Sequence, residues 1–441
     1  MKFIYADTLD YVDPRYDFVA DRSPTDRELY WDDVFPHELL GYAPYDGLLV
    51  SRSAVGNNYG TAKYTQAQTM RFRRVGAREF LRYRESDYPG SVIFGDSGAF
   101  AYHKREDPPY TAEDMVDFYG DGQFTHGCSV DHIIFDFLEF DAAKEANYVS
   151  SEGASENKRR HDITLANAND FLTRSKRLGR QFTPLGVIQG WSPLSMAKAA
   201  KSLKTMGFNY LGIGGLVPLS IKQIKVALGA IFDEIGTSVK IHLLGFAKAD
   251  GISEFGKHNI ASFDTTSPLI RAFKDTRKNY YLPGGNGALT FYSAIRVPQS
   301  MENHQLKRLV KEGRYTTEDL QDREQNTLRK LRAYDSGQAD LMETLQAVMD
   351  YTTPLLFGRD EGFSQIEKKK LSEIEDRTHR TLSDAPWKKC SCSVCKEISI
   401  EVVIFRASNR NKRRGIHNLG VYQRHIKELN LRGSDEASLD L

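Results

Sequence analysis

Three cysteines and a histidine near the C-terminus have the residue types and spacing of a metal site. Cys390, Cys392 and Cys395 lie close together, and His417 follows them, so the segment offers three thiolates and one imidazole. Four such ligands complete a tetrahedral zinc site, and a site closed in this way is structural. His425 is an alternative fourth ligand, and spacing alone does not separate the two histidines. We expect one structural Zn²⁺ in this segment.

Two aspartates at the ends of separate apolar runs form a second chemical pattern. Asp96 closes the run Val92–Asp96, and Asp264 closes the run Ile260–Asp264. Two carboxyl groups in one site can act as nucleophile and acid–base catalyst, because burial and mutual repulsion separate their pKa values. Such a pair supports a retaining exchange at a sugar carbon. An aspartate at a strand end can equally be a capping or turn residue, so this pattern alone leaves both interpretations open.

The elements that must position these residues are short apolar strands separated by helical segments. We predict strands at Gly47–Val50, Val92–Asp96, His132–Asp136, Leu185–Gln189, Tyr210–Gly214, Ile241–Gly245 and Ile260–Asp264. Short apolar runs are typical of parallel strands that helices cover on both faces. An eighth strand is expected either near the N-terminus or within Ala288–Val297. The pattern favours an α/β fold, a (β/α)₈ barrel of the TIM type rather than an open doubly wound sheet.

In such a barrel, the loops that follow the strands build the active site. The predicted strands end at or next to Asp96, Asp136, Gln189, Gly214 and Asp264. We therefore expect these residues to meet at one mouth of the barrel.

The chain beyond the last predicted strand changes character, because it is highly charged, helical in pattern and poor in strand formers. We expect a catalytic barrel over 1–300, a charged helical insertion over 301–383, a zinc-binding module with a closing helix over 384–433, and a flexible tail over 434–441. The domain organisation is thus a barrel with an insertion and a C-terminal zinc-binding subdomain.

Charge is spread unevenly along the 441 residues, whose formal net charge is only +1. Lys368–Arg424 contains 14 Lys and Arg but 6 Asp and Glu. A basic region of this kind is typical of a surface that binds a polyanion, or of a solvated positive face. The chain has no apolar run of the ~18–20 residues that a membrane span needs and no signal-peptide core. We expect a soluble, cytoplasmic protein without membrane contact.

Several short motifs, in the same order, resemble those of the tRNA-guanine transglycosylases over most of the predicted barrel and the zinc segment. The matching segments are Asp96-Ser97-Gly98-Ala99-Phe100, Phe135-Asp136, Val187-Ile188-Gln189-Gly190, Gly214-Gly215-Leu216, Phe263-Asp264, the cysteine cluster and His417-Asn418. The resemblance implies that Asp264 attacks the ribose C1′ of a guanosine, while Asp96 transfers protons to and from the leaving and entering bases. It also implies that the base is held by Asp136, Gln189, Gly214, Gly215 and Phe100.

The chemistry of guanine agrees with this set of base-binding residues. Guanine carries donors at N1 and N2, which a carboxylate accepts, and an acceptor at O6, which an amide or backbone N–H satisfies. A covalent intermediate lets guanine leave and a free 7-deazaguanine enter without cutting the strand.

Two departures from the family pattern favour its DNA-acting branch, with DNA as the partner. The loop Val217-Pro218-Leu219-Ser220 has no carboxylate where the family binds an aminomethyl-bearing base, which favours the neutral nitrile base preQ0. Thr265–Ile270 replaces an arginine-containing stretch in the region that would hold the polynucleotide. A duplex must flip out its guanine at a cost of a few kcal/mol. Whether an ATP-dependent partner protein opens the duplex is left open.

Seven cations near the zinc segment are expected to hold phosphates: Lys388, Lys389, Arg406, Arg410, Lys412, Arg413 and Arg414. Contacts of this kind make affinity fall steeply with salt concentration. Three alternatives remain at this stage: the same base exchange on tRNA, a non-catalytic nucleic-acid-binding barrel, and a glycoside hydrolase that uses Asp96 and Asp264.

Overall fold

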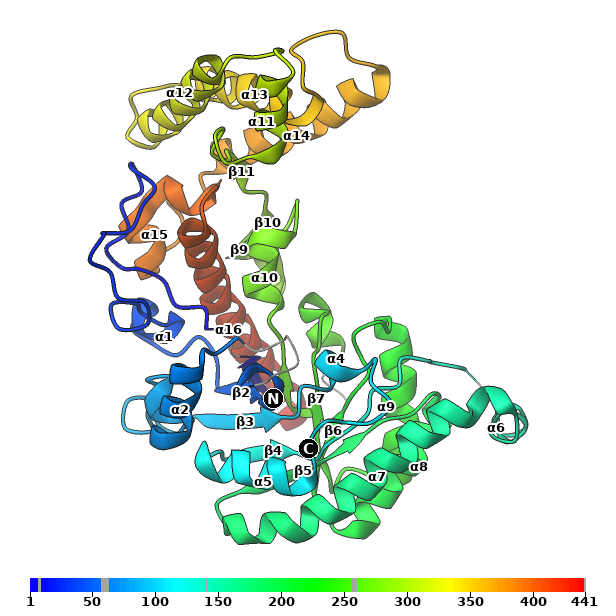
Figure 1. The fold of residues 1–441 in the computed structure, drawn as a ribbon. Helices are drawn as coiled ribbons and strands as arrows, with labels where there is room; N and C mark the ends of the chain where they lie inside the picture. Colours follow the sequence, from blue (N-terminus) through cyan, green and yellow to red (C-terminus); the bar gives the residue numbers. More distant parts are fainter. Residues whose placement is uncertain (7–8, 57–62, 140, 256–259, 440–441) are drawn as a thin grey trace. The chain divides into compact units, whose positions relative to one another are not determined.

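The computed structural model describes residues 1–6, 9–56, 63–139, 141–255 and 260–439 (Figure 1). The chain divides into two compact units, which we describe separately. Unit 1 comprises Met1–Leu9, Tyr45–Ser267 and Leu429–Leu441, and unit 2 comprises Asp10–Pro44 and Pro268–Glu428. The expected barrel domain spans 1–300, whereas this division assigns 10–44 and 268–300 to unit 2.

Unit 1 contains a closed barrel of eight parallel strands. The strands are β1 (Lys2–Ala6), β2 (Gly47–Ser51), β3 (Val92–Asp96), β4 (His126–Cys128), β5 (Thr183–Ile188), β6 (Tyr210–Ile213), β7 (Lys240–Leu243) and β8 (Ile260–Asp264). Each strand pairs with the next, and β8 closes the barrel on β1, where Phe3 lies opposite Phe263. The predicted α/β barrel is confirmed.

The prediction of the fourth strand is wrong, whereas the other six predicted strands are present. The strand forms at β4, and residues 129–139 have neither helix nor strand structure. Ile133 and Ile134 are buried in this irregular segment, which explains why an apolar run suggested a strand there. The eighth strand is β1 at the N-terminus, while the alternative segment Ala288–Val297 contributes to small sheets of unit 2.

Helices surround the barrel strands (Figure 1). They are α2 (Gln66–Val75), α3 (Ala77–Phe80), α4 (Ala99–Tyr102), α5 (Ala112–Asp121), α6 (Ala142–Val149), α7 (Ser155–Ser175), α8 (Pro193–Met206) and α9 (Ile221–Ile235). Local sequence sets their ends: Ser192 caps α8, which begins with Pro193 and stops at Gly207 in the left-handed conformation. The buried face of α9 is apolar, as its helical periodicity predicts.

The barrel interior is filled by side chains, and His242 of β7 and Ser262 of β8 are among the fully buried ones. A buried cluster contains Ile4, Leu49, Val92, Phe94, Cys128, Leu185, Val187 and Tyr210. This packed layer closes the barrel, so a ligand can enter only at a mouth, where the loops lie. The carboxyl ends of β3 and β8 carry Asp96 and Asp264, and in a parallel barrel these ends share one mouth.

Unit 2 is mainly helical. Its helices are α1 (Pro36–Leu40), α10 (Ser267–Lys274, which begins at the last residue of unit 1), α11 (His304–Lys311), α12 (Thr317–Asp335), α13 (Leu341–Phe357), α14 (Gln365–Asp384), α15 (Ser393–Ile398) and α16 (Ser408–Leu439, which extends into unit 1). Two small sheets pair β9 (Tyr280–Pro283) with β10 (Leu289–Tyr292) and β11 (Ile295–Arg296) with β12 (Ile404–Phe405).

The helical insertion expected at 301–383 corresponds to α11, α12, α13 and α14, which gather into one cluster (Figure 1). The tail expected at 434–441 is helical through Leu439, and its last two residues lie outside the described part of the chain. None of the described helices combines the length and apolarity that crossing a membrane requires.

Candidate active site and metal centre

Asp96 ends β3 and turns its carboxyl group into a cluster of acidic side chains. The Ser51 hydroxyl and the Gly98 backbone N–H donate to this carboxyl group, but its Oδ1 is buried and has no hydrogen-bond partner among the described residues. Burial, with the negative charges of Asp264 and Asp131, raises the pKa of Asp96 to about 7. A carboxyl group with this pKa can give and take a proton near neutral pH, as an acid–base catalyst must.

Asp264 ends β8 and is only 5 % exposed. One of its oxygens, Oδ1, lies 3.1 Å from His242 Nε2 and accepts a hydrogen bond of 2.9 Å from the Gly245 backbone N–H. No hydrogen bond to the other oxygen, Oδ2, occurs in the part of the chain that the structure describes. The carboxyl group is thus held through one oxygen, and the second is available for chemistry.

Asp131 is a third buried carboxyl group, and the sequence interpretation missed it. Its Oδ2 accepts a 2.7 Å hydrogen bond from Gln189 Nε2, and its Oδ1 accepts one of 3.2 Å from the Ser97 hydroxyl. Burial raises the pKa of Asp131 to about 6, although these two hydrogen bonds act in the opposite direction. Ser97 follows Asp96 directly, so the Asp-Ser-Gly motif connects two of the three acids.

Asp136, the expected base-reading acid, lies outside this group. Its side chain is exposed and accepts a 2.7 Å hydrogen bond from Asn157 Nδ2. The difference follows from the misplaced fourth strand, because β4 ends at Cys128 and the loop after it brings Asp131 to Gln189. In the sequence, Asp131 follows a short polar strand that contains a glycine. This pattern is a weaker sign of a site residue than the apolar run that precedes Asp136.

Gln189, Gly214 and Gly215 are brought together as expected. A Cβ atom on Gly214 would lie 2.2 Å from Gln189 Nε2, and one on Gly215 would lie 2.8 Å from the Ile134 carbonyl oxygen. Gly215 also has a φ of +72°, which larger residues rarely adopt. A side chain at Gly214 would therefore collide with Gln189, which holds Asp131, and one at Gly215 would collide with the backbone of Ile134.

Phe100, the expected stacking residue, is 59 % exposed on α4. Its ring lies edge-on to Phe135 at 6.1 Å and tilted to His103 at 5.6 Å. An aromatic face that remains open to solvent can stack on a planar base, so the exposure is compatible with the expected role.

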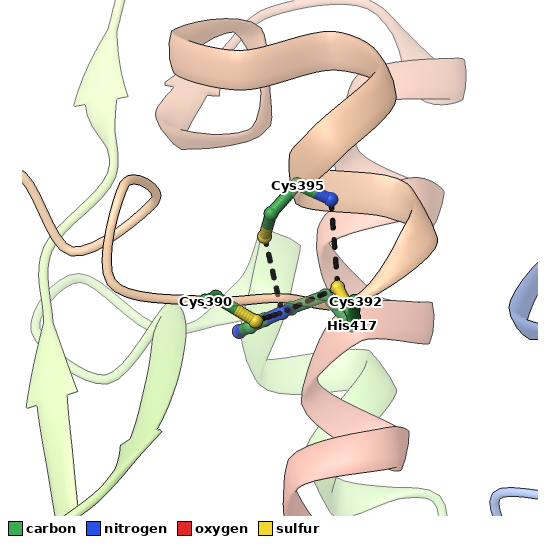
Figure 2. Close-up of side chains that lie close together, drawn as sticks. All are labelled: Cys390, Cys392, Cys395 and His417. Carbon is green, nitrogen blue, oxygen red and sulfur yellow. Dashed lines mark hydrogen bonds between the residues drawn. The ribbon is translucent and has the colours of Figure 1, made fainter.

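The predicted metal ligands converge in unit 2 (Figure 2). The ligand atoms of Cys390, Cys392, Cys395 and His417 all lie within 4.8 Å of one another. His417 Nδ1 is 3.6 Å from the Cys390 sulfur and 3.4 Å from each of the other two sulfurs. Sulfur and nitrogen ligands on a tetrahedral zinc lie ~3.5 Å apart, so the donor set could hold such an ion. The geometry selects His417 over His425, which is not part of this group.

The surroundings of His417 prepare its Nδ1 for a metal. Its Nε2 lies 2.8 Å from the Tyr281 carbonyl oxygen, which can only accept, so Nε2 carries the proton. The Tyr280 ring stacks on the imidazole at 4.0 Å, and its hydroxyl is 3.1 Å from the Cys395 sulfur. Cys392 also caps α15, because its sulfur accepts from the Cys395 backbone N–H.

The structure corrects the expectation that four arginines of α16 and the segment before it hold phosphates. Arg410, Arg413 and Arg414 are 0 % exposed, and the Arg406 side chain is 6 % exposed. Arg406 and Arg410 both pair with Asp21. Burial in ion pairs or, for Arg414, in hydrogen bonds to backbone carbonyl oxygens leaves these guanidinium groups no surface to offer a nucleic acid.

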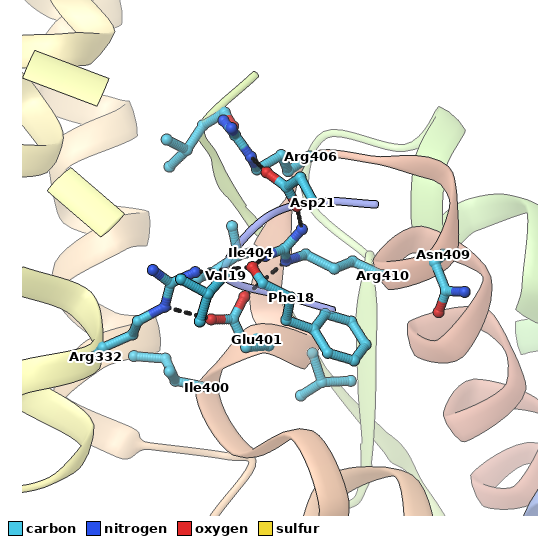
Figure 3. A network of polar contacts seen from close by, with 12 residues as sticks. Phe18, Val19, Asp21, Arg332, Ile400, Glu401, Ile404, Arg406, Asn409 and Arg410 are labelled. Carbon is cyan, nitrogen blue, oxygen red and sulfur yellow. Dashed lines mark hydrogen bonds and ion pairs between the residues drawn. The ribbon is translucent and has the colours of Figure 1, made fainter. Parts of the chain in front are cut away.

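This buried network is balanced by acids from distant parts of the sequence (Figure 3). The two carboxylate oxygens of Glu401 each lie 2.7 Å from an arginine, Oε2 from Arg410 Nε and Oε1 from Arg332 Nε. Glu324 Oε1 lies 2.5 Å from Arg406 Nη2. The network joins residues of the 10–44 segment, α12 and the C-terminal part of unit 2, so it acts as an internal connection.

The three expected lysines differ from the arginines and from one another. Lys389 is exposed, whereas the Lys388 ammonium donates to the Asp335 carbonyl oxygen at 2.7 Å. Lys412 is partly buried and donates to the Tyr11 carbonyl oxygen at 3.2 Å. Among the seven expected phosphate-binding cations, Lys389 therefore remains the best placed for that role.

Comparison with known proteins gives the family. No protein-family model matches the chain. Over 439 residues, which are 99 % of each of the two chains, it is 37 % identical to a curated DNA-guanine transglycosylase of Salmonella montevideo. Identity at this level across both whole chains, together with the confirmed barrel, means that the chain belongs to the guanine transglycosylase enzymes of the tRNA-guanine transglycosylase superfamily, in its DNA-acting branch.

Proposed function

We propose that the protein exchanges guanine in DNA for a 7-deazaguanine, preQ0, through a covalent intermediate on Asp264. The observation that carries this proposal is the pair formed by Asp264, held through one oxygen, and Asp96, whose pKa is raised to about 7. One group has a nucleophilic oxygen and the other a transferable proton, which are the two requirements for replacing a base without cutting the strand.

The proposed first step breaks the bond between deoxyribose C1′ and guanine N9. Asp264 Oδ2 attacks C1′, the bonding electron pair moves to guanine, and Asp96 donates a proton to the departing base. The product is an ester between Asp264 and the sugar, with Asp96 left as a carboxylate. In the second step, Asp96 removes the N9 proton of the entering base, N9 attacks C1′, and the Asp264 carboxylate leaves.

Asp131 takes the base-reading role in this proposal. Its carboxylate would accept from guanine N1–H and N2–H, while Gln189 fixes it by the 2.7 Å hydrogen bond. Gly214 N–H already donates to the Ile188 carbonyl oxygen, so the O6 acceptor falls to the Gly215 N–H or the second amide hydrogen of Gln189. Phe100 would stack on the ring.

The loop 217–220 supports a neutral entering base. It carries no carboxylate, and the Lys248 ammonium donates to the Val217 carbonyl oxygen at 3.1 Å. A positive group next to this loop disfavours an aminomethyl base, which is itself a cation, but tolerates a nitrile. We therefore assign preQ0 as the free base.

The test is incorporation of labelled preQ0 into three substrates: duplex DNA, single-stranded DNA and tRNA. We expect label in DNA together with release of guanine. Label in tRNA alone would reject the DNA assignment. Label in single-stranded but not duplex DNA would indicate that a partner protein opens the duplex, since extruding a paired base costs a few kcal/mol.

We assign the ion of the cysteine and histidine cluster as structural zinc, because four protein ligands leave no open position for a substrate. Zinc would hold α15, α16 and the strand β9 together through their ligands and the Tyr281 carbonyl contact. Metal analysis of the purified protein should give one zinc per chain. Folded, undamaged protein with no bound metal would contradict this assignment.

A further inference from the structure

A line of three buried side chains ends at the oxygen Oδ1 of Asp264. Tyr210 OH lies 2.6 Å from Ser262 Oγ, Ser262 Oγ lies 2.5 Å from His242 Nδ1, and His242 Nε2 lies 3.1 Å from Asp264 Oδ1. Their exposed fractions are 5 % for Tyr210, 1 % for Ser262 and 0 % for His242. These residues come from β6, β8 and β7, so neighbouring strands of the barrel fix the line.

The proton positions in this line follow from the number of donors. If Asp264 is a carboxylate, it can only accept, so His242 Nε2 must carry a hydrogen. His242 Nδ1 then accepts from the Ser262 hydroxyl, and the Ser262 oxygen accepts from the Tyr210 hydroxyl. Every donor and acceptor in the line is satisfied with a neutral imidazole. The opposite tautomer would place the Nε2 lone pair against a negative oxygen.

The ring of His242 is also held by packing. Phe94 stacks on it with a centroid separation of 4.9 Å, and His126 stacks on Phe94 at 4.3 Å. Because His242 is fully buried, it cannot touch a nucleic acid and can act only through Asp264.

We infer that His242 is a positioning residue for the nucleophile, held as the neutral Nε2–H tautomer by the Tyr210 and Ser262 hydroxyl groups. Together with the Gly245 N–H, it fixes Asp264 Oδ1 and directs Oδ2 to the sugar. When the ester of the intermediate breaks, negative charge returns to Asp264, and the same two donors stabilise it there. The inference rests on the proposed role of Asp264.

Substitutions along the line should have graded effects on kcat for base exchange. His242→Phe removes a donor aimed at developing charge, for which a loss of about 10²–10³-fold is expected. Ser262→Ala leaves the tautomer unconstrained and should cost about 10-fold, and Tyr210→Phe less than that, as each removes one more distant hydrogen bond. His242→Gln offers an amide N–H in the same direction and should recover part of the loss. The KM values for DNA and free base should stay near those of the wild type.

A second measurement covers the case in which His242→Phe does not fold. In wild-type protein with ¹⁵N-labelled histidine, NMR should show His242 with a protonated Nε2 and an unprotonated Nδ1. A doubly protonated ring or the opposite tautomer would overturn the inference, as would a folded His242→Phe enzyme with unchanged kcat. These outcomes are distinct from failure of the proposed function, in which wild-type protein forms no DNA adduct at all.

Discussion

The acids at the barrel mouth and the arginines of unit 2 are both buried, yet only the arginines meet opposite charges. Arg406 and Arg410 pair with Asp21, Glu324 and Glu401. At the barrel mouth, the charged groups acting on Asp96 are two further aspartates, and the pKa of Asp96 rises to about 7. A buried charge without a counter-charge is costly, so it persists where it serves a reaction, whereas a balanced network serves the fold.

The largest effect should come from Asp264→Asn, which removes the proposed nucleophile. We expect base exchange to fall by about 10⁴-fold or more, as when the nucleophile of a covalent catalyst is lost. The covalent protein–DNA adduct, measured on a denaturing gel after quenching, should disappear. A variant that kept full exchange would show that Asp264 is not the nucleophile. The acids at the barrel mouth would then no longer differ in function from the buried arginines.

The second-largest effect should be a loss of stability in Arg410→Met, which removes one arginine from the buried ion-pair network. Removing one partner leaves the charges of Asp21 and Glu401 undercompensated, which costs about 3–5 kcal/mol of the free energy of unfolding. Denaturant unfolding measures this loss, and the salt dependence of DNA binding should not change.

Lys389→Met is the matched control for Arg410→Met, because this lysine is exposed. Its stability should stay near that of the wild type, while the slope of log affinity against log salt should fall by about 1 if it contacts a phosphate. A normal stability for Arg410→Met with a lower salt slope would mean that the buried arginine reaches DNA.

Asp131→Asn and Asp136→Asn test which acid reads the base. An amide at position 131 loses the charge that would accept from guanine, so kcat/KM for exchange should fall by about 10- to 100-fold, the effect of about 1.4–2.7 kcal/mol. Asp136→Asn should remain close to the wild type, because that side chain is exposed and bonded to Asn157. If exchange fell in Asp136→Asn and not in Asp131→Asn, Asp136 would be the acid that reads the base, as the sequence predicted.

The smallest effect concerns stability at different pH values. Folding raises the pKa of Asp96 from its ordinary 3.8 to about 7, so between these pH values the folded protein keeps a proton that the unfolded chain loses. The contribution of Asp96 to stability is therefore full below pH ~4 and is lost as pH rises toward ~7. Asp96→Asn cannot lose a proton, so it should gain about 1–2 kcal/mol over the wild type between pH 5 and pH 8 after allowing for partial exposure.

Thermal unfolding of both proteins at the two pH values measures this difference. An equal shift of the thermal midpoint at pH 5 and pH 8 would show that Asp96 carries no unusual charge cost. Exchange activity should be low in the variant at either pH.

Much of the barrel could be predicted from the sequence, because six strands are continuous apolar runs that end in a polar or glycine residue. The fourth strand failed for a physical reason: His126-Gly127-Cys128 carries little apolar signal, while Ile133 and Ile134 are buried without forming a strand. Burial and strand pairing are separate properties, and hydrophobic pattern reports only the first.

In the candidate site too, some residues could be found from the sequence and others only from the structure. Asp96, Asp264, Gln189 and the two glycines were found because each lies at a strand end in a recognisable motif. His242 was overlooked because a single histidine inside a strand has no distinctive spacing, and its role depends on Ser262 and Tyr210 from neighbouring strands. Such contacts join residues that are far apart in sequence.

The sequence by itself determined the metal ligand types, the strand-end acids and the alternation of strands and helices, because these are local properties of composition and spacing. Only the tertiary structure decided that His417 rather than His425 joins the cysteine cluster, that Asp131 rather than Asp136 lies against Gln189, and that the arginines of α16 face inward. The sequence pattern of these arginines would be the same on an exposed surface as in a buried ion pair, because their partner Asp21 lies hundreds of residues away.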